Sequence, residues 1–285
     1  FLKVGLPFFK DTKIGVVQTR WEHLNENYSI ISRLQAFQLN VHFTIEQTGR
    51  EQGDFMLQFN GTAGIWRRKT IEDAGGWEAD TLTEDLDLSY RAQLRGWKIF
   101  YLEEFGSPAE LPAEMNGLKS QQYRWMKGGA ETAKKLLPVV WNSPLSIHKK
   151  LHATGHLLSS GIFLFVFLTA LISVPVLIFM NYKSMDPTFL QIFLISMLSI
   201  IAVYFTANIS SPAIGNGTKV KSILRFTLMF PLFLSLSMGL SLHNSLAVLH
   251  GYLGKKTAFV RTPKFNIKAL DDSIRKRVYL AEHLS

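Results

Sequence analysis

Hydrophobic residues are distributed differently in the two parts of this chain. Residues 1–150 mix short apolar runs with polar stretches, whereas residues 151–252 hold long apolar runs with few charges. Short apolar runs bounded by turn-forming residues predict strands, and they occur at Ile14–Gln18, Phe55–Phe59 and Trp97–Leu102. The pattern therefore predicts a folded domain with a sheet, followed by a membrane part.

Two segments with helical spacing lie between and after these strands. Asn25–Phe43 carries apolar residues at helical intervals and contains neither glycine nor proline. Glu84–Arg95 follows a capping-box pattern that starts at Thr81, and it precedes Gly96, a residue type that commonly ends a helix. Strands that alternate with helices indicate an α/β fold.

A third helix is predicted over Leu118–Leu137. Gly128 and Gly129 are expected to interrupt it, and Pro138 is expected to end it. Its mixture of Trp125 with leucines and lysines suits a helix that lies along a membrane surface. An ordinary amphipathic surface helix is the alternative.

Three apolar segments follow, at about 157–180, 189–207 and 226–250. A helix needs about 20 apolar residues to span a bilayer, so the second segment is short for a crossing. Basic loops precede and follow the third segment, and one full crossing would place them on opposite sides, against the positive-inside rule. Either the third segment, which contains Pro231 and Gly239, is bent or re-entrant, or one basic loop lies outside.

Composition narrows the class of protein further. The chain has no cysteine, which excludes disulfides, a thiolate nucleophile and cysteine-bound zinc. The net charge is +9, and much of the excess lies near the apolar runs, as expected beside anionic lipid rather than nucleic acid. The basic residues near these runs are Lys134, Lys135, Lys149, Lys150, Lys219, Lys221, Lys255 and Lys256.

The first cluster with chemical potential is Asn60-Gly61-Thr62, which follows a predicted strand. Glycine lets backbone amides approach a ligand closely, so this turn can hold a substrate. A tight hairpin turn without any ligand would use the same residues. The cluster alone does not decide between these two interpretations.

The second cluster is Thr83-Glu84-Asp85, at the start of a predicted helix. A carboxylate at this place commonly does no more than stabilise the helix dipole. Its functional interpretation is a general base, held rigidly so that it can take a proton from an attacking hydroxyl.

The third cluster is Gln121-x-x-Arg124-Trp125. Positions i, i+3 and i+4 share one face of a helix, so the amide, guanidinium and indole are expected to point into one site. Arginine binds phosphate with a fork of donors, and tryptophan offers a flat platform for a sugar ring. A snorkelling arginine beside an interfacial tryptophan is the alternative.

In this order, and before apolar helices, these motifs resemble family-2 glycosyltransferases of the membrane-embedded polysaccharide synthase type. The resemblance covers Trp21 to about Lys135 and is nearest to plant cellulose-synthase-like mannan synthases. It rests on FNGTAGIWRR, DAGGW, TEDLDLSYRAQLRGWK and QQYRW. It implies the C-terminal part of a GT-A-type domain, the nucleotide-diphospho-sugar transferase fold, followed by transmembrane helices.

The resemblance also implies roles for individual residues. Asp85 would be the catalytic base, with Glu84 beside it at the substrate. Gln121, Arg124 and Trp125 would border the acceptor and the nucleotide diphosphate. Asn60, Gly61 and Thr62 would bind the substrate, and Gln18, in the Val17-Gln18-Thr19 motif, would lie near the donor.

Phe259–Lys264 (FVRTPK) resembles the gating loop of processive cellulose synthases, and it departs from that pattern at Arg261. In that family the loop closes over the donor from the cytoplasmic side. The resemblance therefore implies that Thr262 and Lys264 meet phosphate oxygens. It also favours an irregular third apolar segment.

The Asp-x-Asp motif that holds Mg²⁺ or Mn²⁺ in that family is not found at a suitable position. Asp85-Leu86-Asp87 has the right letters but belongs to the base motif, so no metal ligand is assigned here. Because the chain begins at Phe1 without a glycine-rich phosphate loop, we expect the metal motif upstream and this piece alone to be inactive.

The expected function is inverting transfer of a hexosyl group from UDP-glucose or GDP-mannose to a growing β-glycan, with export of the polymer. The expected partners are the nucleotide sugar, the glycan acceptor, membrane lipid and an accessory export subunit, without nucleic acid. The alternatives are a non-processive lipid glycosyltransferase, similar to ceramide glucosyltransferases, and a sugar-nucleotide-binding membrane protein without turnover.

The expected location is the inner or plasma membrane, with the catalytic domain in the cytoplasm. The expected organisation has four parts. They are a glycosyltransferase domain at 1–113, interfacial helices at 114–150, transmembrane helices at 151–252 and a gating-loop-like segment at 253–285.

Overall fold

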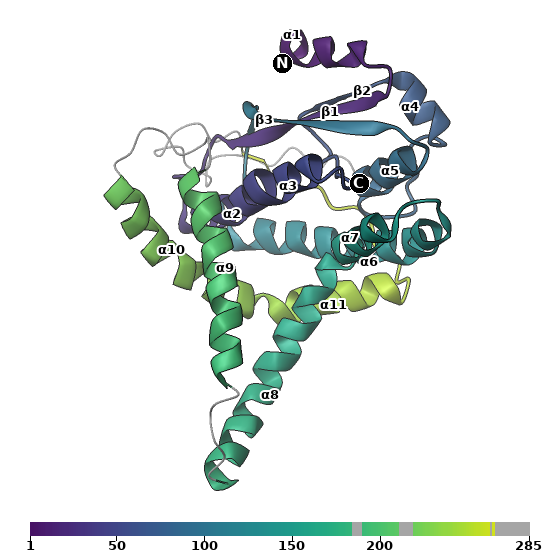
Figure 1. Cartoon of the computed structure of the whole chain (residues 1–285). Coiled ribbons are helices and arrows are strands. Elements are labelled where there is room, and N and C mark those ends of the chain that lie inside the picture. Colours follow the sequence, from purple (N-terminus) through teal and green to yellow (C-terminus); the bar gives the residue numbers. More distant parts are fainter. Residues whose placement is uncertain (184–189, 211–218, 263, 266–285) are drawn as a thin grey trace.

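The computed structural model describes residues 1–183, 190–210, 219–262, 264 and 265. Its sheet has three strands in the order β2-β1-β3 (Figure 1). The central strand β1 (Ile14–His23) pairs antiparallel with β2 (Gly64–Trp66) and parallel with β3 (Lys98–Ala109). The strands predicted near Ile14 and Trp97 are confirmed, and the α/β class with them.

The strand predicted at Phe55–Phe59 is wrong, although this segment is extended and its residues Met56, Leu57 and Phe59 are buried. Side chains, rather than a neighbouring strand, satisfy its backbone. Gln93 bonds both the N–H and the carbonyl of Leu57 at 2.9 and 2.8 Å, and Ser89 Oγ accepts from the Phe59 amide at 2.9 Å. The segment therefore lies along a helix instead of joining the sheet.

Helices cover one face of the sheet (Figure 1). The helix predicted over Asn25–Phe43 begins later and ends in a different form, since α2 spans Ile30–Asn40 and continues as the π-helix η2 (Val41–Gln47). Ser29 caps it through its side chain and shares a capping box with Ser32. The short helix α3 (Thr48–Gln52) follows directly.

The sequence pattern missed three short helical elements at the outer side of the sheet. They are α1 (Leu2–Gly5), the 3-10 helix η1 (Leu6–Lys10) and α4 (Arg68–Asp73). Each has six residues or fewer, which is too short to show the repeat of apolar residues that predicts an amphipathic helix.

The helix α5 (Glu84–Leu94) confirms the predicted helix, and Gly96 follows it with a φ of +90°. The capping box predicted from Thr81 is wrong, because the N-cap is Thr83 and its side chain makes no capping bond. Its hydroxyl instead lies 3.1 Å from that of Thr132 in α6 (Met115–Asn142). The start of α5 is thus tied to another helix.

The 28-residue helix α6 runs through Gly128, Gly129 and Pro138, so the predicted interruption and end are wrong. Gly128 marks a place of close packing, because a Cβ there would lie 2.8 Å from the Thr83 backbone nitrogen. A second close approach is at Gly251, where a Cβ would lie 2.6 Å from the Lys127 carbonyl. The start of α5 therefore packs closely on α6 at Gly128, and the α6 backbone at Lys127 is approached through a glycine of another element.

The chain continues through α7 (Ile147–Leu157), the 3-10 helix η3 (Ser159–Gly161), α8 (Ile162–Lys183) and α9 (Leu190–Ser210). The helices α8 and α9 project away from the α/β part (Figure 1). Within the described residues, Ser159–Tyr182 and Val220–Gly239 are long and apolar enough to span a membrane, and Met197–Ile209 is a shorter apolar stretch.

The predicted third apolar segment is bent, because α10 (Lys219–Gly239) and α11 (Ser241–Tyr252) meet at Leu240. Arg225 near the start of α10 forms an ion pair with Glu26. At the other end, the Tyr252 carbonyl accepts from Lys134 Nζ of α6 at 2.9 Å. The two ends of this segment therefore contact Glu26 and Lys134, both of which belong to the first 150 residues.

Candidate active site

Asp85 lies in the first turn of α5. The loop of residues 60–63, which follows the Phe55–Phe59 segment, lies beside it. Asp85 Oδ1 accepts from the Leu86 amide at 2.9 Å, and its backbone carbonyl accepts from Ser89 Oγ at 2.5 Å. A Cβ placed on Gly61, which has a φ of +70°, would lie 3.1 Å from Asp85 Oδ2. The carboxylate is thus fixed against a loop that only glycine allows to approach.

Burial dominates the electrostatics of this carboxylate. It raises the pKa of Asp85 from its ordinary value of 3.8 to about 7, and the charge of Glu84 adds to the rise. The Leu86 amide and the Arg124 guanidinium oppose it. The residue as a whole is half-buried, so it keeps access to a substrate. A carboxylate with a pKa near neutrality is suited to accept a proton.

Gln18 of β1 holds the loop that contains Gly61. Its Oε1 accepts from the Asn60 amide at 3.0 Å, and its Nε2 donates to the carbonyls of Thr62 and Ala63, both at 3.1 Å. Gln18 itself is fully buried. The predicted substrate-binding residues Gln18, Asn60, Gly61 and Thr62 therefore form one connected unit beside Asp85.

The three predicted residues of α6 have different surroundings. Gln121 is buried and accepts a hydrogen bond from Gln35 Nε2 of α2. Trp125 packs against Trp21, with 6.5 Å between ring centroids. Burial lowers the pKa of Arg124, while the charges of Asp85 and Glu84 oppose this effect. Arg124 is thus coupled electrostatically to Asp85 and Glu84 at the start of α5.

The C-terminal segment reaches the same region. The Phe259 ring lies under the Arg124 guanidinium at 4.8 Å, and the Phe265 amide donates to Glu110 Oε1 at 2.8 Å. Thr262 is buried and its hydroxyl has no hydrogen-bond partner among the described residues, whereas Lys264 is exposed. Residue 263 and the part of the predicted 253–285 segment after residue 265 lie outside the described residues.

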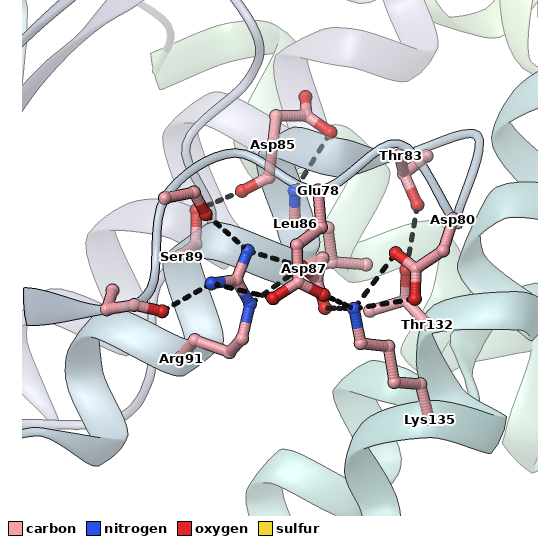
Figure 2. Close-up of polar contacts among 12 residues, drawn as sticks. Glu78, Asp80, Thr83, Asp85, Leu86, Asp87, Ser89, Arg91, Thr132 and Lys135 are labelled. Carbon is pink, nitrogen blue, oxygen red and sulfur yellow. Dashed lines mark hydrogen bonds and ion pairs between the residues drawn. The ribbon is translucent and has the colours of Figure 1, made fainter. Parts of the chain in front are cut away.

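Asp87 is two residues from Asp85, but its carboxylate lies elsewhere. Figure 2 shows Asp87 facing Arg91 and Lys135, with Asp85 on the other side of the helix start. Asp87 Oδ2 lies 2.7 Å from Arg91 Nη2, and Asp87 Oδ1 lies 3.0 Å from Lys135 Nζ. Lys135 Nζ also meets Glu78 and Asp80 at 2.6 and 2.9 Å.

This cluster bears on the divalent metal that the resemblance implies. Among the described residues, one cluster of acidic side chains could share a metal ion, namely Glu78, Asp80 and Asp87, whose carboxylate oxygens lie within 4.8 Å of one another. The ammonium of Lys135 already lies at hydrogen-bond distance from all three and takes the place of a cation. These residues do not fit Mg²⁺ or Mn²⁺, and Asp87 acts instead in an ion-pair network between α5 and α6.

Sequence reasoning missed several residues that hold the site. Ser89 and Gln93 of α5 bond the extended segment, and His42 of η2 bonds Asn60, with 2.9 Å between Nε2 and Oδ1. Ser89 and Gln93 carry a usable signal, since their spacing of four puts them on one face of a helix. His42 has no such signal because a π-helix follows no common periodicity.

An α/β unit with a base-like carboxylate beside a glycine loop, next to a long amphipathic helix, fits a sugar-nucleotide transferase. The chain belongs to glycosyl transferase family group 2, whose family model matches residues 1–209. The predicted family resemblance is therefore confirmed.

Similar curated proteins include three plant mannosyltransferases. Probable glucomannan 4-beta-mannosyltransferase 4 of Oryza sativa subsp. japonica is 36% identical over 189 residues, which is 66% of this chain and 33% of the relative. Glucomannan 4-beta-mannosyltransferase 1 of the same plant is 39% identical, over 53% of this chain and 30% of the relative. Glucomannan 4-beta-mannosyltransferase 7 of Arabidopsis thaliana is 40% identical, over 53% and 27%. The chain thus spans about a third of the length of these relatives.

Proposed function

We propose that this protein transfers a hexosyl group from a nucleotide sugar to a β-glycan, with inversion at the anomeric carbon. The observation that carries the proposal is the Asp85 carboxylate, held at the start of α5 against Gly61 with a pKa raised by burial to about 7. Membership of glycosyl transferase family group 2 supports it. Its mannosyltransferase relatives support GDP-mannose as a donor beside UDP-glucose.

The proposal gives each side chain of the site a role in the reaction. Asp85 takes the proton from an acceptor hydroxyl, and the oxygen forms a bond to the anomeric carbon while the bond from that carbon to the diphosphate breaks. One displacement with one base inverts the configuration. Arg124, which is electrostatically coupled to Asp85, offsets negative charge on the leaving diphosphate. Trp125 and Gln121 border the acceptor.

The apolar helices support a membrane setting for this reaction. Ser159–Tyr182 and Val220–Gly239 each suffice to span a bilayer by length and composition. In this proposal the site faces the cytoplasm, the Phe259–Lys264 segment covers the donor, and the polymer leaves through the membrane, with lipid and an accessory export subunit as partners. The inner or plasma membrane is the proposed location.

The test uses the protein expressed from its complete gene in membranes. Radiolabelled GDP-mannose and UDP-glucose are supplied separately, and the products are sized. Long, alkali-resistant polymer from one donor supports the proposal and identifies the sugar. A single sugar on extracted lipid identifies a lipid glycosyltransferase instead. The control is membranes from cells without the gene. The proposal is overturned if the membranes with the protein transfer sugar from these and other nucleotide sugars no faster than the control membranes.

The pH dependence of the reaction is a second prediction. Asp85 must be deprotonated to act as a base, and its pKa is raised to about 7. We expect kcat/KM to be constant above about pH 8 and to fall about tenfold per pH unit well below 7. Replacing Glu84 by Gln removes a charge that raises this pKa, so the midpoint moves to lower pH. A profile that stays flat from about pH 5 to 8 contradicts the role of Asp85.

A further inference from the structure

Two side chains hold the loop that touches Asp85, and they hold different parts of it. Gln18 bonds the backbone of residues 60–63, as described above. His42 bonds the side chain of Asn60, with 2.9 Å between Nε2 and Oδ1. Asn60 immediately precedes Gly61, whose Cα faces Asp85 Oδ2. The position of the side-chain amide of Asn60 is therefore set by His42, which lies outside the sequence motifs of the site.

The π-helix η2 brings His42 to this place. Besides His42, which contacts Asn60, a second side chain of η2 reaches this part of the chain. Gln47 Nε2 donates to the Gln58 carbonyl at 2.6 Å. π-helical turns are rare and occur frequently at functional sites. This π-helix forms hydrogen bonds with both Gln58 and Asn60, next to Gly61.

His42 is held from its other side as well. Its Nδ1 lies 3.0 Å from Glu46 Oε2, one turn further along η2. Arg50 of α3 pairs with the same Glu46 oxygen at 3.3 Å. Burial raises the pKa of Glu46, but the hydrogen bond with His42 and the charge of Arg50 oppose it, and the pKa is lowered to about 2. Glu46 is thus a fixed acceptor.

This geometry decides which end of the Asn60 amide is used. Asn60 Oδ1 is an acceptor, so the His42 Nε2 that faces it at 2.9 Å is the donor of this hydrogen bond. The other end of the amide, Asn60 Nδ2, is enclosed and has no hydrogen-bond partner among the described residues. An enclosed N–H without a partner is costly unless a ligand supplies an acceptor.

We propose that His42 is a positioning residue that fixes the Asn60 amide so that its N–H group binds an oxygen of the donor substrate beside Asp85. This inference rests on the proposed function, because it requires a nucleotide sugar in the site. The oxygen belongs either to a sugar hydroxyl or to the diphosphate. Both are hydrogen-bond acceptors, and binding experiments separate them.

The test measures binding of GDP-mannose, UDP-glucose, GDP and UDP to the protein expressed from its complete gene, in detergent. Replacing His42 by Leu frees the Asn60 amide and is expected to weaken binding of the preferred nucleotide sugar about tenfold, the effect of one hydrogen bond. His42→Gln, whose amide can still donate to Asn60 Oδ1, restores most of the affinity. If the free diphosphate is weakened equally, the oxygen is on phosphate, and if it is not, the oxygen is on the sugar.

A double-mutant cycle separates positioning from a general effect on the fold. Asn60→Ala removes the N–H, so adding His42→Leu to that variant is expected to change the affinity no further. Independent, additive losses overturn the proposal, as does His42→Leu binding with the affinity of the unaltered protein. Should His42→Leu fail to fold, failure of His42→Gln to bind better than His42→Glu overturns it. Absence of binding by the unaltered protein would count instead against the proposed function.

Discussion

Replacement of Asp85 by Asn is expected to lower the rate of sugar transfer by a factor of about 10² to 10⁴, the contribution of a positioned general base. Asparagine keeps the shape of the side chain and can still accept from the Leu86 amide. It cannot take a proton. The substitution leaves Gln18 and Asn60, the residues proposed to bind the donor, unchanged, so binding of the nucleotide sugar is expected to stay within about threefold. Initial transfer rates and equilibrium binding measure the two effects.

The same substitution is expected to stabilise the protein. In the folded state Asp85 keeps its proton up to about pH 7, whereas in the unfolded chain it ionises at its ordinary value of 3.8. Its contribution to stability is therefore most favourable below pH 3.8, declines as the pH rises to 7 and is lost above. At pH 8 the full cost is of order 2–4 kcal/mol, reduced by partial access to solvent. Asn carries no such cost.

The matched control for this variant is Asp73→Asn. Asp73 is an exposed carboxylate that accepts from Trp97 Nε1 at 2.8 Å, and Asn can accept the same bond. This control is expected to leave transfer and the unfolding temperature unchanged. Transfer by Asp85→Asn at the rate of the unaltered protein would assign the base to another residue. A large loss of stability in Asp85→Asn would mean that the charge itself holds the fold.

The sequence predicted the elements whose signals are local. The helix α5 was predicted almost to the residue. The strands β1 and β3 were found from their apolar runs, since β1 is buried continuously from Ile14 to Arg20 and β3 buries alternate residues at its start. Asp85 was likewise identified from its motif, and the structure places it beside Gly61. What the motif could not show is the raised pKa, which arises from burial against segments distant in sequence.

The errors share one physical cause. Phe55–Phe59 has the composition of a strand, but Ser89 and Gln93 supply its hydrogen bonds from a helix, and these partners are 30 and 36 residues away in sequence. The glycines of α6 have a low helix propensity, yet the helix continues because close neighbours replace the missing side chains. In each case a tertiary contact overrides a local preference.

Replacement of Gly128 by Ala is expected to displace the start of α5 and to lower transfer by about 10²-fold, as misplacement of a catalytic group by about 1 Å can do. The new Cβ would lie 2.6 Å from Thr83 Cγ2 and 2.9 Å from the Leu82 carbonyl carbon. The backbone atoms leave little room to adjust, so Thr83 and the adjacent Asp85 must move. Overpacking of this kind costs about 1–3 kcal/mol, which exceeds the roughly 1 kcal/mol that alanine contributes to a helix interior.

Gly129→Ala provides the control in the same helix, one residue away. There the added methyl group meets Ser160 at 3.4 Å, an ordinary contact distance, so the helix propensity of alanine acts with little opposition. We expect Gly129→Ala to retain transfer and to unfold at an equal or higher temperature, while Gly128→Ala loses both. Equal behaviour of the two variants would show that α6 does not set the position of Asp85. The contrast assigns to α6 the task of holding the base against the glycine loop, because Thr83 touches α6 at Gly128 and at Thr132.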